Sequence, residues 1–198
     1  MPDDEKRWIQ RAREGDEEEF SRIVGAYQRP VFNLCYRMLG ERTQAEDAAQ
    51  ETFLRAFLNL KHYDAERPFA TWLLSIASHH CIDRLRRRRL HLASLEELNG
   101  AMQFADAAPG PEKVLAVSEE ERELRQSLLQ LPRKDRAAVV LRYWHGLSYA
   151  EVGETLSLTP SAVKSRLHRA RRQLAEQWSS RQSELVPIRG RQDEASTV

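Results

Sequence analysis

A run of basic residues after Pro160 carries side chains suited to contacting DNA. Val163, Leu167, Ala170 and Leu174 recur at helical spacing, which predicts the buried stripe of a helix. The remaining positions are polar or basic and form the predicted DNA-contacting set: Ser161, Lys164, Ser165, Arg166, His168, Arg169, Arg171 and Arg172. Arginine and lysine side chains contact guanine O6 and N7 in the major groove. The pattern therefore favours binding to duplex DNA, against the alternative of a solvated basic helix face.

The residues before this run predict a second, shorter helix. Ser148 and Glu151 have the spacing of a capping box. Thr159 is suited to cap the following helix, with Pro160 at its first position. Gly153 lacks a side chain where two helices of such a motif approach closely. Short helix, tight turn and basic helix together predict a helix-turn-helix, although Arg166 stands where such motifs often carry an apolar residue.

A second cationic site runs from Asp83 to Arg89 and includes five arginines. Tyr63, Phe69 and Trp72 lie upstream of it, and cations beside aromatic rings suit single-stranded DNA, whose bases stack on such rings. Two other interpretations stay open. The arginines also complement a helix dipole, and the aromatic residues also suit a core.

An acidic segment precedes both basic sites, between Gln44 and Arg55. Its outward residues share one helix face: Glu46, Asp47, Gln50 and Glu51. This face predicts a docking surface for a basic protein partner, and a solvated face is the alternative.

Bulk composition narrows the function classes. The chain has 198 residues, 41% of them hydrophobic, and a formal net charge of +1. Cys35 and Cys81 are its only cysteines and lie at apolar helical positions, which predicts buried free thiols. Adjacent His79 and His80 point about 100° apart on a helix, so no metal site is predicted. We expect no cofactor, no catalytic residue, no signal peptide and no membrane span, in keeping with a reducing cytoplasm.

Helical periodicity predicts an all-α fold of two small domains joined by a flexible linker. The first domain, residues 1–90, contains apolar stripes at Phe20–Tyr27, Val31–Leu39, Ala49–Leu60 and Leu73–Leu85, and Asp16 with Glu19 predicts a capping box before the first. Residues 91–119 include Pro109-Gly110-Pro111 and predict the linker, with a short helix over 94–98. Residues 120–178 form the predicted helix-turn-helix domain, and residues 179–198 a disordered tail.

Four segments in this order resemble extracytoplasmic-function sigma factors of bacterial RNA polymerase. They are Tyr27–Gly40 (YQRPVFNLCYRMLG), Gln44–Leu60 (QAEDAAQETFLRAFLNL), Phe69–Arg89 (FATWLLSIASHHCIDRLRRRR) and Leu131–Leu174. The resemblance implies a cytoplasmic bacterial protein that binds core polymerase at the largest-subunit clamp helices and the flap region. It also implies reading of duplex minus-thirty-five DNA and melted, single-stranded minus-ten DNA.

The resemblance assigns site residues by motif position. The minus-thirty-five set is the outward face after Pro160. The minus-ten set comprises Tyr63, Phe69, Thr71, Trp72, His79, Asp83, Arg84, Arg86 and Arg87. The core-binding set comprises Glu46, Asp47, Gln50, Glu51 and Arg55. Family members commonly pair with a membrane-anchored anti-sigma factor, so such a partner is expected, holding the protein at the inner membrane until it joins the nucleoid.

One departure and several alternatives stay open. Many family members carry asparagine where this chain has His79, so the usual minus-ten base preference does not transfer. The main alternative is a helix-turn-helix regulator that acts without core polymerase, such as a two-component or quorum-type regulator. An inactive sigma-like interaction module and an enzyme with an appended DNA-binding domain are the others. The sequence gives neither the promoter bases nor the inducing signal.

Overall fold

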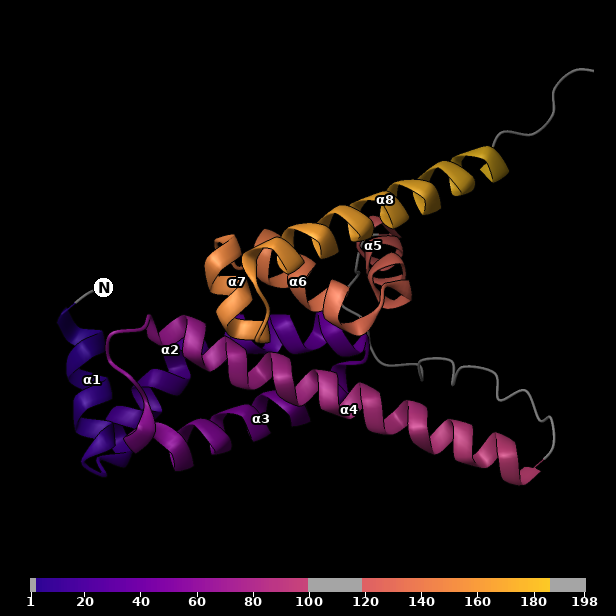
Figure 1. Ribbon diagram of the computed structural model, residues 1–198. Coiled ribbons are helices and arrows are strands. Elements are labelled where there is room, and N and C mark those ends of the chain that lie inside the picture. The colour runs from indigo at the N-terminus through magenta and orange to yellow at the C-terminus, as the bar shows by residue number, and fades with distance from the viewer. Residues whose placement is uncertain (1–2, 100–118, 186–198) are drawn as a thin grey trace, which may run out of the picture.

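The computed structural model describes residues 3–99 and 119–185. The helices run as follows: α1 (Asp3–Arg13), α2 (Glu17–Leu39), α3 (Arg42–Asn59), the 3-10 helix η1 (Leu60–His62), α4 (Phe69–Asn99), α5 (Glu119–Gln130), α6 (Arg133–Tyr143), α7 (Tyr149–Leu156) and α8 (Pro160–Leu185). The described residues contain no strand, which confirms the all-α prediction. Figure 1 shows α5 to α8 stacked over α2 and α4, with α4 and α8 each extending beyond the bundle.

The first domain differs from the predicted division into helices. Residues 3–13 form α1, which the sequence patterns did not identify, and the two stripes on either side of Pro30 belong to one helix, α2. Proline removes one backbone donor from a helix, but α2 continues through it because Ile23, Val31 and Leu34 bury the same face in the core. Tertiary packing has therefore outweighed a local helix-breaking signal.

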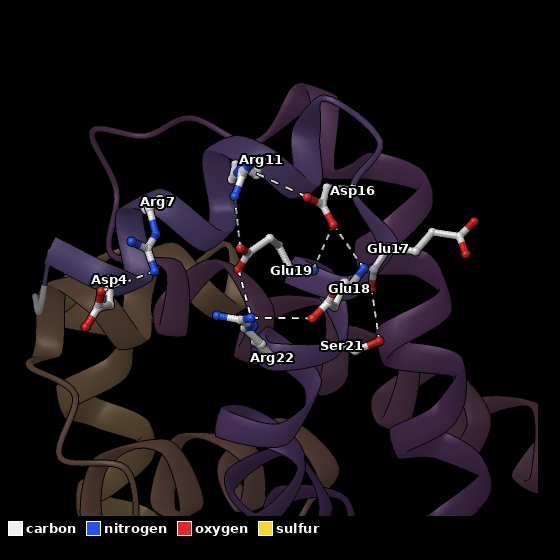
Figure 2. Close-up of polar contacts among 9 residues, drawn as sticks. All are labelled: Asp4, Arg7, Arg11, Asp16, Glu17, Glu18, Glu19, Ser21 and Arg22. Carbon is white, nitrogen blue, oxygen red and sulfur yellow. Dashed lines mark hydrogen bonds and ion pairs between the residues drawn. The ribbon is translucent and has the colours of Figure 1, made fainter.

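Asp16 caps α2, as predicted, by accepting hydrogen bonds from the backbone of Glu18 and Glu19. The Glu19 carboxylate does not complete a capping box. It is almost fully buried and lies between Arg11 of α1 and Arg22 of α2, at 3.5 and 3.6 Å, as Figure 2 shows. Glu19 thus joins α1 to α2 by charge.

Two helices run across predicted domain boundaries. Helix α4 continues to Asn99, well past the expected start of the linker at residue 91, and α8 continues to Leu185, past the expected start of the tail at residue 179. Residues 100–118 and 186–198, where the rest of the predicted linker and tail fall, lie outside the described residues.

The helix-turn-helix follows its predicted capping chemistry closely. Ser148 and Glu151 form a reciprocal capping box at α7, and the Thr159 hydroxyl accepts from the Ala162 backbone at the start of α8. A Cβ on Gly153 would lie 2.6 Å from the Leu158 carbonyl oxygen. Glycine is therefore needed because the turn backbone, rather than the second helix, approaches α7.

The two domains pack against each other around the C-terminal end of α2. The buried Arg136 of α6 donates hydrogen bonds to the Met38 carbonyl of α2 and to the Leu129 and Leu131 carbonyls. Burial lowers the pKa of Arg136 to about 10. Arg37 of α2 also lies over the Trp144 ring, 4.9 Å from its centroid. These contacts join α2 to the second domain directly.

Cys35 and Cys81 are buried free thiols, as predicted. They face each other between α2 and α4. The hydrogen bond with Cys35 raises the pKa of the Cys81 thiol most, and burial raises it further. Both are therefore packing residues. None of the described helices is long and apolar enough to cross a membrane.

Candidate nucleic-acid interface

Helix α8 presents the predicted basic face to solvent. Val163, Leu167 and Ala170 are buried, which leaves the polar positions between them outside. The exposed members of the predicted set are Ser161, Lys164, Ser165, His168, Arg169, Arg171 and Arg172. Arg172 also pairs with Glu176 one turn later, at 2.8 Å. These positions therefore form one exposed polar and basic face along α8.

Arg166 lies at the edge of this exposed face and is held by the protein itself, and its contact with DNA stays a prediction. Its guanidinium lies 2.5 Å from Asp135 of α6, and its side chain is only 26% exposed. Arg169 reaches the other oxygen of the same carboxylate at 3.6 Å. Asp135 is almost fully buried, so it fixes α8 on α6 and orients Arg169 outward.

The second basic site lies on the outer part of α4. Arg86 and Arg87 are exposed, and Asp83 and Arg84 are partly buried. His79 is exposed one to two turns earlier, where its Nδ1–H donates to the Ser75 carbonyl at 2.9 Å. The other ring nitrogen, Nε2, takes no part in this hydrogen bond. These residues form a row of polar groups along one helix.

The aromatic residues predicted to stack on bases form a cluster inside the first domain. Tyr63 contacts Phe69 and Trp72 at centroid distances of 5.2 and 5.0 Å. Tyr63, Phe69 and Thr71 are 4%, 0% and 6% exposed, so in this arrangement they do not reach a base directly. Trp72 is partly exposed and is the ring of this group available for stacking. The buried members support the start of α4.

The predicted docking face lies on α3, beside the basic part of α4. Glu46, Asp47, Gln50 and Arg55 are exposed and Glu51 is partly buried. Glu51 pairs with Arg55 at 2.6 Å, and this hydrogen bond lowers the pKa of Glu51. Asp47 pairs with Arg84 of α4 at 3.4 Å. The acidic face and the basic site are therefore in direct contact.

Two features of this region were not predicted from the sequence. Leu54 and Leu58 continue the acidic face toward the end of α3 and are 54% and 67% exposed. Their helical spacing from Asp47 and Glu51 (three to four residues at each step) was a usable signal, but the predicted face included only polar and charged residues. His80 was set aside as half of a rejected metal motif, yet it lies in the pocket between α3 and α4.

Comparison with known proteins identifies the family of this chain. The family model for Sigma-70 region 2 matches residues 23–91, and the one for Sigma-70, region 4 matches residues 121–174. The chain is 38% identical over 178 residues to the ECF RNA polymerase sigma factor SigW of Bacillus subtilis, covering 87% of this chain and 95% of SigW. The chain belongs to the ECF family of RNA polymerase sigma factors. It is also 30% identical to the RNA polymerase sigma-H factor of Pseudomonas aeruginosa, over 84% of this chain and 90% of that protein.

Solved structures share the fold of this sigma factor. The structure of CnrH in complex with the cytosolic domain of CnrY matches with a TM-score of 0.65 at 24% identity, over 90% of this chain and 99% of that one. The sigma factor RpoE from Bartonella quintana, solved with the anti-sigma factor NepR, also matches with a TM-score of 0.65, at 19% identity over 80% of this chain and 96% of that one. The two-domain helical fold is therefore that of known sigma factors.

The family assignment settles the function class. This sigma factor directs transcription initiation by RNA polymerase at promoter DNA, and its family is not enzymatic. A helix-turn-helix regulator that acts without core polymerase is not favoured, because the region 2 match covers most of the first domain.

Proposed function

We propose that this sigma factor uses three surfaces: α8 and α4 bind promoter DNA, and α3 binds core polymerase. The observation that supports this division most strongly is the placement of two separate basic helices, one preformed and exposed and one in contact with an acidic face. Each surface then has a partner of distinct chemistry.

Helix α8 reads the duplex minus-thirty-five element. Lys164, His168 and Arg169 occupy the outward positions of its first turns, where a recognition helix meets base edges. Arg171 and Arg172 lie one turn further along and suit contacts with phosphates, which set the register. Base identity is then read chiefly by Lys164, His168 and Arg169.

Helix α4 binds the melted minus-ten element. Trp72 supplies a stacking ring, His79 an imidazole edge, and Arg84, Arg86 and Arg87 bind the strand's phosphates. Binding only the open strand shifts the equilibrium from duplex to bubble by the difference in affinity between the two forms. On this account, opening needs no nucleotide hydrolysis and no catalytic residue.

Helix α3 docks on the clamp helices of the largest polymerase subunit. Its acidic residues match a basic surface, while Leu54 and Leu58 supply exposed apolar area that such docking would bury. The second domain reaches the flap region. Once both domains are held by core polymerase, their effective concentration on one promoter rises.

An anti-sigma factor is the proposed inhibitory partner, by analogy with related complexes, in which CnrH is bound to the cytosolic domain of CnrY and RpoE to NepR. The place of action is the bacterial cytoplasm: the nucleoid when the protein is active, and the inner membrane when a membrane-anchored partner retains it.

Binding to two DNA probes tests the division of labour. The holoenzyme is offered a minus-thirty-five duplex and a single minus-ten strand, from a promoter selected out of genomic fragments. Lys164→Ala should weaken duplex binding only, and Arg86→Ala should weaken strand binding only. Equal losses on both probes for each variant would contradict the proposed division.

A further inference from the structure

A pocket of about 200 Å³ lies where the two domains meet. Arg29, Asn33 and Arg37 line it from α2, and Trp144 and His145 line it from the turn between α6 and α7. Two arginines thus border one small space, and no carboxylate of the described residues takes part in its lining. The pocket is positive and is assembled from both domains.

The two arginines are held in different ways. Arg29 is exposed, and its side chain has no ion pair within the part of the chain that the structure describes. Arg37 donates a hydrogen bond to the Asn33 carbonyl at 3.3 Å and lies over the Trp144 ring. Burial lowers the pKa of Arg37, and the charge of Glu121 on α5 raises it. One arginine is therefore fixed in place, and the other is available to a ligand.

His145 adds an unsatisfied polar atom at this pocket. Its Nε2 is enclosed and lacks a hydrogen-bond partner among the described residues. Burial, and then the charge of Arg37, lowers the pKa of His145 to about 4, so the ring is neutral near pH 7 and has one N–H to donate. Buried polar groups of proteins nearly always have a partner. An acceptor that a ligand brings to the pocket would provide one.

We propose that this pocket binds the phosphate group of a small phosphate monoester, and that the bound ligand holds the two domains together. Guanidinium groups match phosphate oxygens in geometry and charge, which assigns the main contacts to Arg29 and Arg37. The Asn33 amide and the His145 ring offer neutral donors beside them. Because these groups come from α2 and from the second domain, one ligand contacts both domains.

A phosphate monoester suits the pocket better than a carboxylate does. It carries nearly two negative charges near pH 7 and three terminal oxygens, which match two arginines and further donors, whereas a carboxylate brings one charge and two oxygens. The volume limits the ligand as well, because pockets for drug-sized molecules usually measure about 300–1,000 Å³. The ligand is therefore a small metabolite, or the phosphate end of a nucleotide whose base projects into solvent.

Holding the domains together opposes promoter binding, a consequence that rests on the proposed function of α4 and α8. Helix α7 packs on both α4 and α8, so at about 8–10 Å for each helix contact the two DNA-binding helices lie roughly 20 Å apart. The minus-ten and minus-thirty-five elements are separated by about 25 base pairs, which is roughly 85 Å of duplex. The domains must therefore separate on a promoter, and core polymerase, which holds them at that spacing, competes with the ligand.

Titration of the free protein with inorganic phosphate locates the site. The chain has four tryptophans, whose indole N–H signals NMR resolves, and the Trp144→Phe variant assigns the signal of Trp144. At constant ionic strength, phosphate should shift the Trp144 signal saturably and leave those of Trp8 and Trp178 in place. Arg29→Gln should weaken the apparent affinity about tenfold. Arg7→Gln, which removes the same charge from α1, is the control and should not change it.

Other anions decide the class of ligand. Acetate at the same concentration should shift the Trp144 signal little. Glycerol 3-phosphate and adenosine monophosphate distinguish the two sources of the phosphate: similar affinities indicate that the phosphate alone is bound, and tighter binding of the second indicates a nucleotide. An equal response to acetate, the absence of a saturable shift, or an unchanged affinity in Arg29→Gln would overturn the proposal.

Core binding tests the inhibitory role. Phosphate at a concentration that fills the pocket should weaken the affinity of core polymerase for the unaltered protein about fivefold, and should change that for Arg29→Gln little. Equal effects on the two proteins would show that the ligand does not hold the domains together. If phosphate binds in the titration but the protein neither binds core nor stimulates a transcript, the pocket is confirmed and the proposed function is wrong.

Discussion

The two basic helices are held in different ways. On α8, Arg166 and Arg169 share the buried carboxylate of Asp135, whereas on α4, Arg84 and Arg86 pair with the exposed carboxylates of Asp47 and Asp83. A buried pair is costly to break, while exposed pairs contribute about 0–1 kcal/mol and exchange readily. The comparison teaches that the proposed minus-thirty-five helix is anchored by a buried ion pair, whereas the proposed minus-ten helix is held by exposed pairs.

Removing the buried carboxylate is the largest perturbation. Asp135→Ala leaves Arg166 without its partner, so the free energy of unfolding should fall by about 3 kcal/mol, at the lower end for a buried pair because Arg166 keeps some solvent contact. Chemical denaturation measures this loss. Glu176→Ala, which breaks the exposed pair with Arg172, is the control and should cost under about 0.5 kcal/mol. Similar losses for both variants would remove the distinction between the two helices.

His145 lies where the two domains meet, beside Arg37 of α2. Burial, and then the charge of Arg37, lowers the pKa of His145 to about 4. Its folded-state pKa is below the unfolded value, so the unfolded chain binds the proton more readily. Stability should therefore hold above about pH 6.5 and fall by about 2 kcal/mol toward pH 4, after allowance for solvent screening.

Denaturation curves between pH 4 and 7.5 test this dependence on His145. His145→Gln cannot titrate in this range, so its stability should change less with pH than that of the unaltered protein. Identical slopes for the two proteins would show that the contact between the domains does not depend on a neutral His145.

Charge reversal on α3 tests the acidic face that pairs with the basic part of α4. Asp47→Lys/Glu51→Lys should weaken core binding by about tenfold, because complementary charges become repulsive. Both side chains are substantially exposed, so helix content should not change, which circular dichroism can verify. Glu17→Lys/Glu18→Lys changes the same charge on α2 and should bind core normally. Undiminished binding by the α3 variant would mean that the docking face lies elsewhere.

The smallest effect is expected at Arg169. Arg169→Ala should weaken minus-thirty-five duplex binding by about fivefold, near the low end for a base-contacting arginine, because Asp135 already shares its charge. Discrimination among variants of that element should relax as well. Competition binding with mutated duplexes checks both effects, and an unchanged preference would exclude Arg169 from base reading.

Local signals predicted the helix-turn-helix well. The Ser148–Glu151 capping box, the Thr159 cap and the buried stripe from Val163 depend on near neighbours, which a sequence displays directly. The same kind of reasoning gave α2 as two separate stripes, Phe20–Tyr27 and Val31–Leu39, because the tertiary packing that buries Ile23 and Val31 on one helix was not visible.

Long-range pairing set the limits of prediction at the candidate site. The ion pair of Arg166 was hidden because its partner, Asp135, lies 31 residues away. Tyr63 and Phe69 looked like stacking rings because composition does not show which aromatic residues pack together. The contact between Asp47 and Arg84, separated by 37 residues, was hidden for the same reason, and the pocket between α3 and α4 was hidden with it.

Run-off transcription tests the central claim most directly. Purified core polymerase is given genomic promoter fragments with and without this protein, and the transcripts are sized. The account predicts discrete transcripts that appear only when the protein is added and disappear with Asp47→Lys/Glu51→Lys. Transcription that is the same with and without the protein, on every fragment, would contradict it.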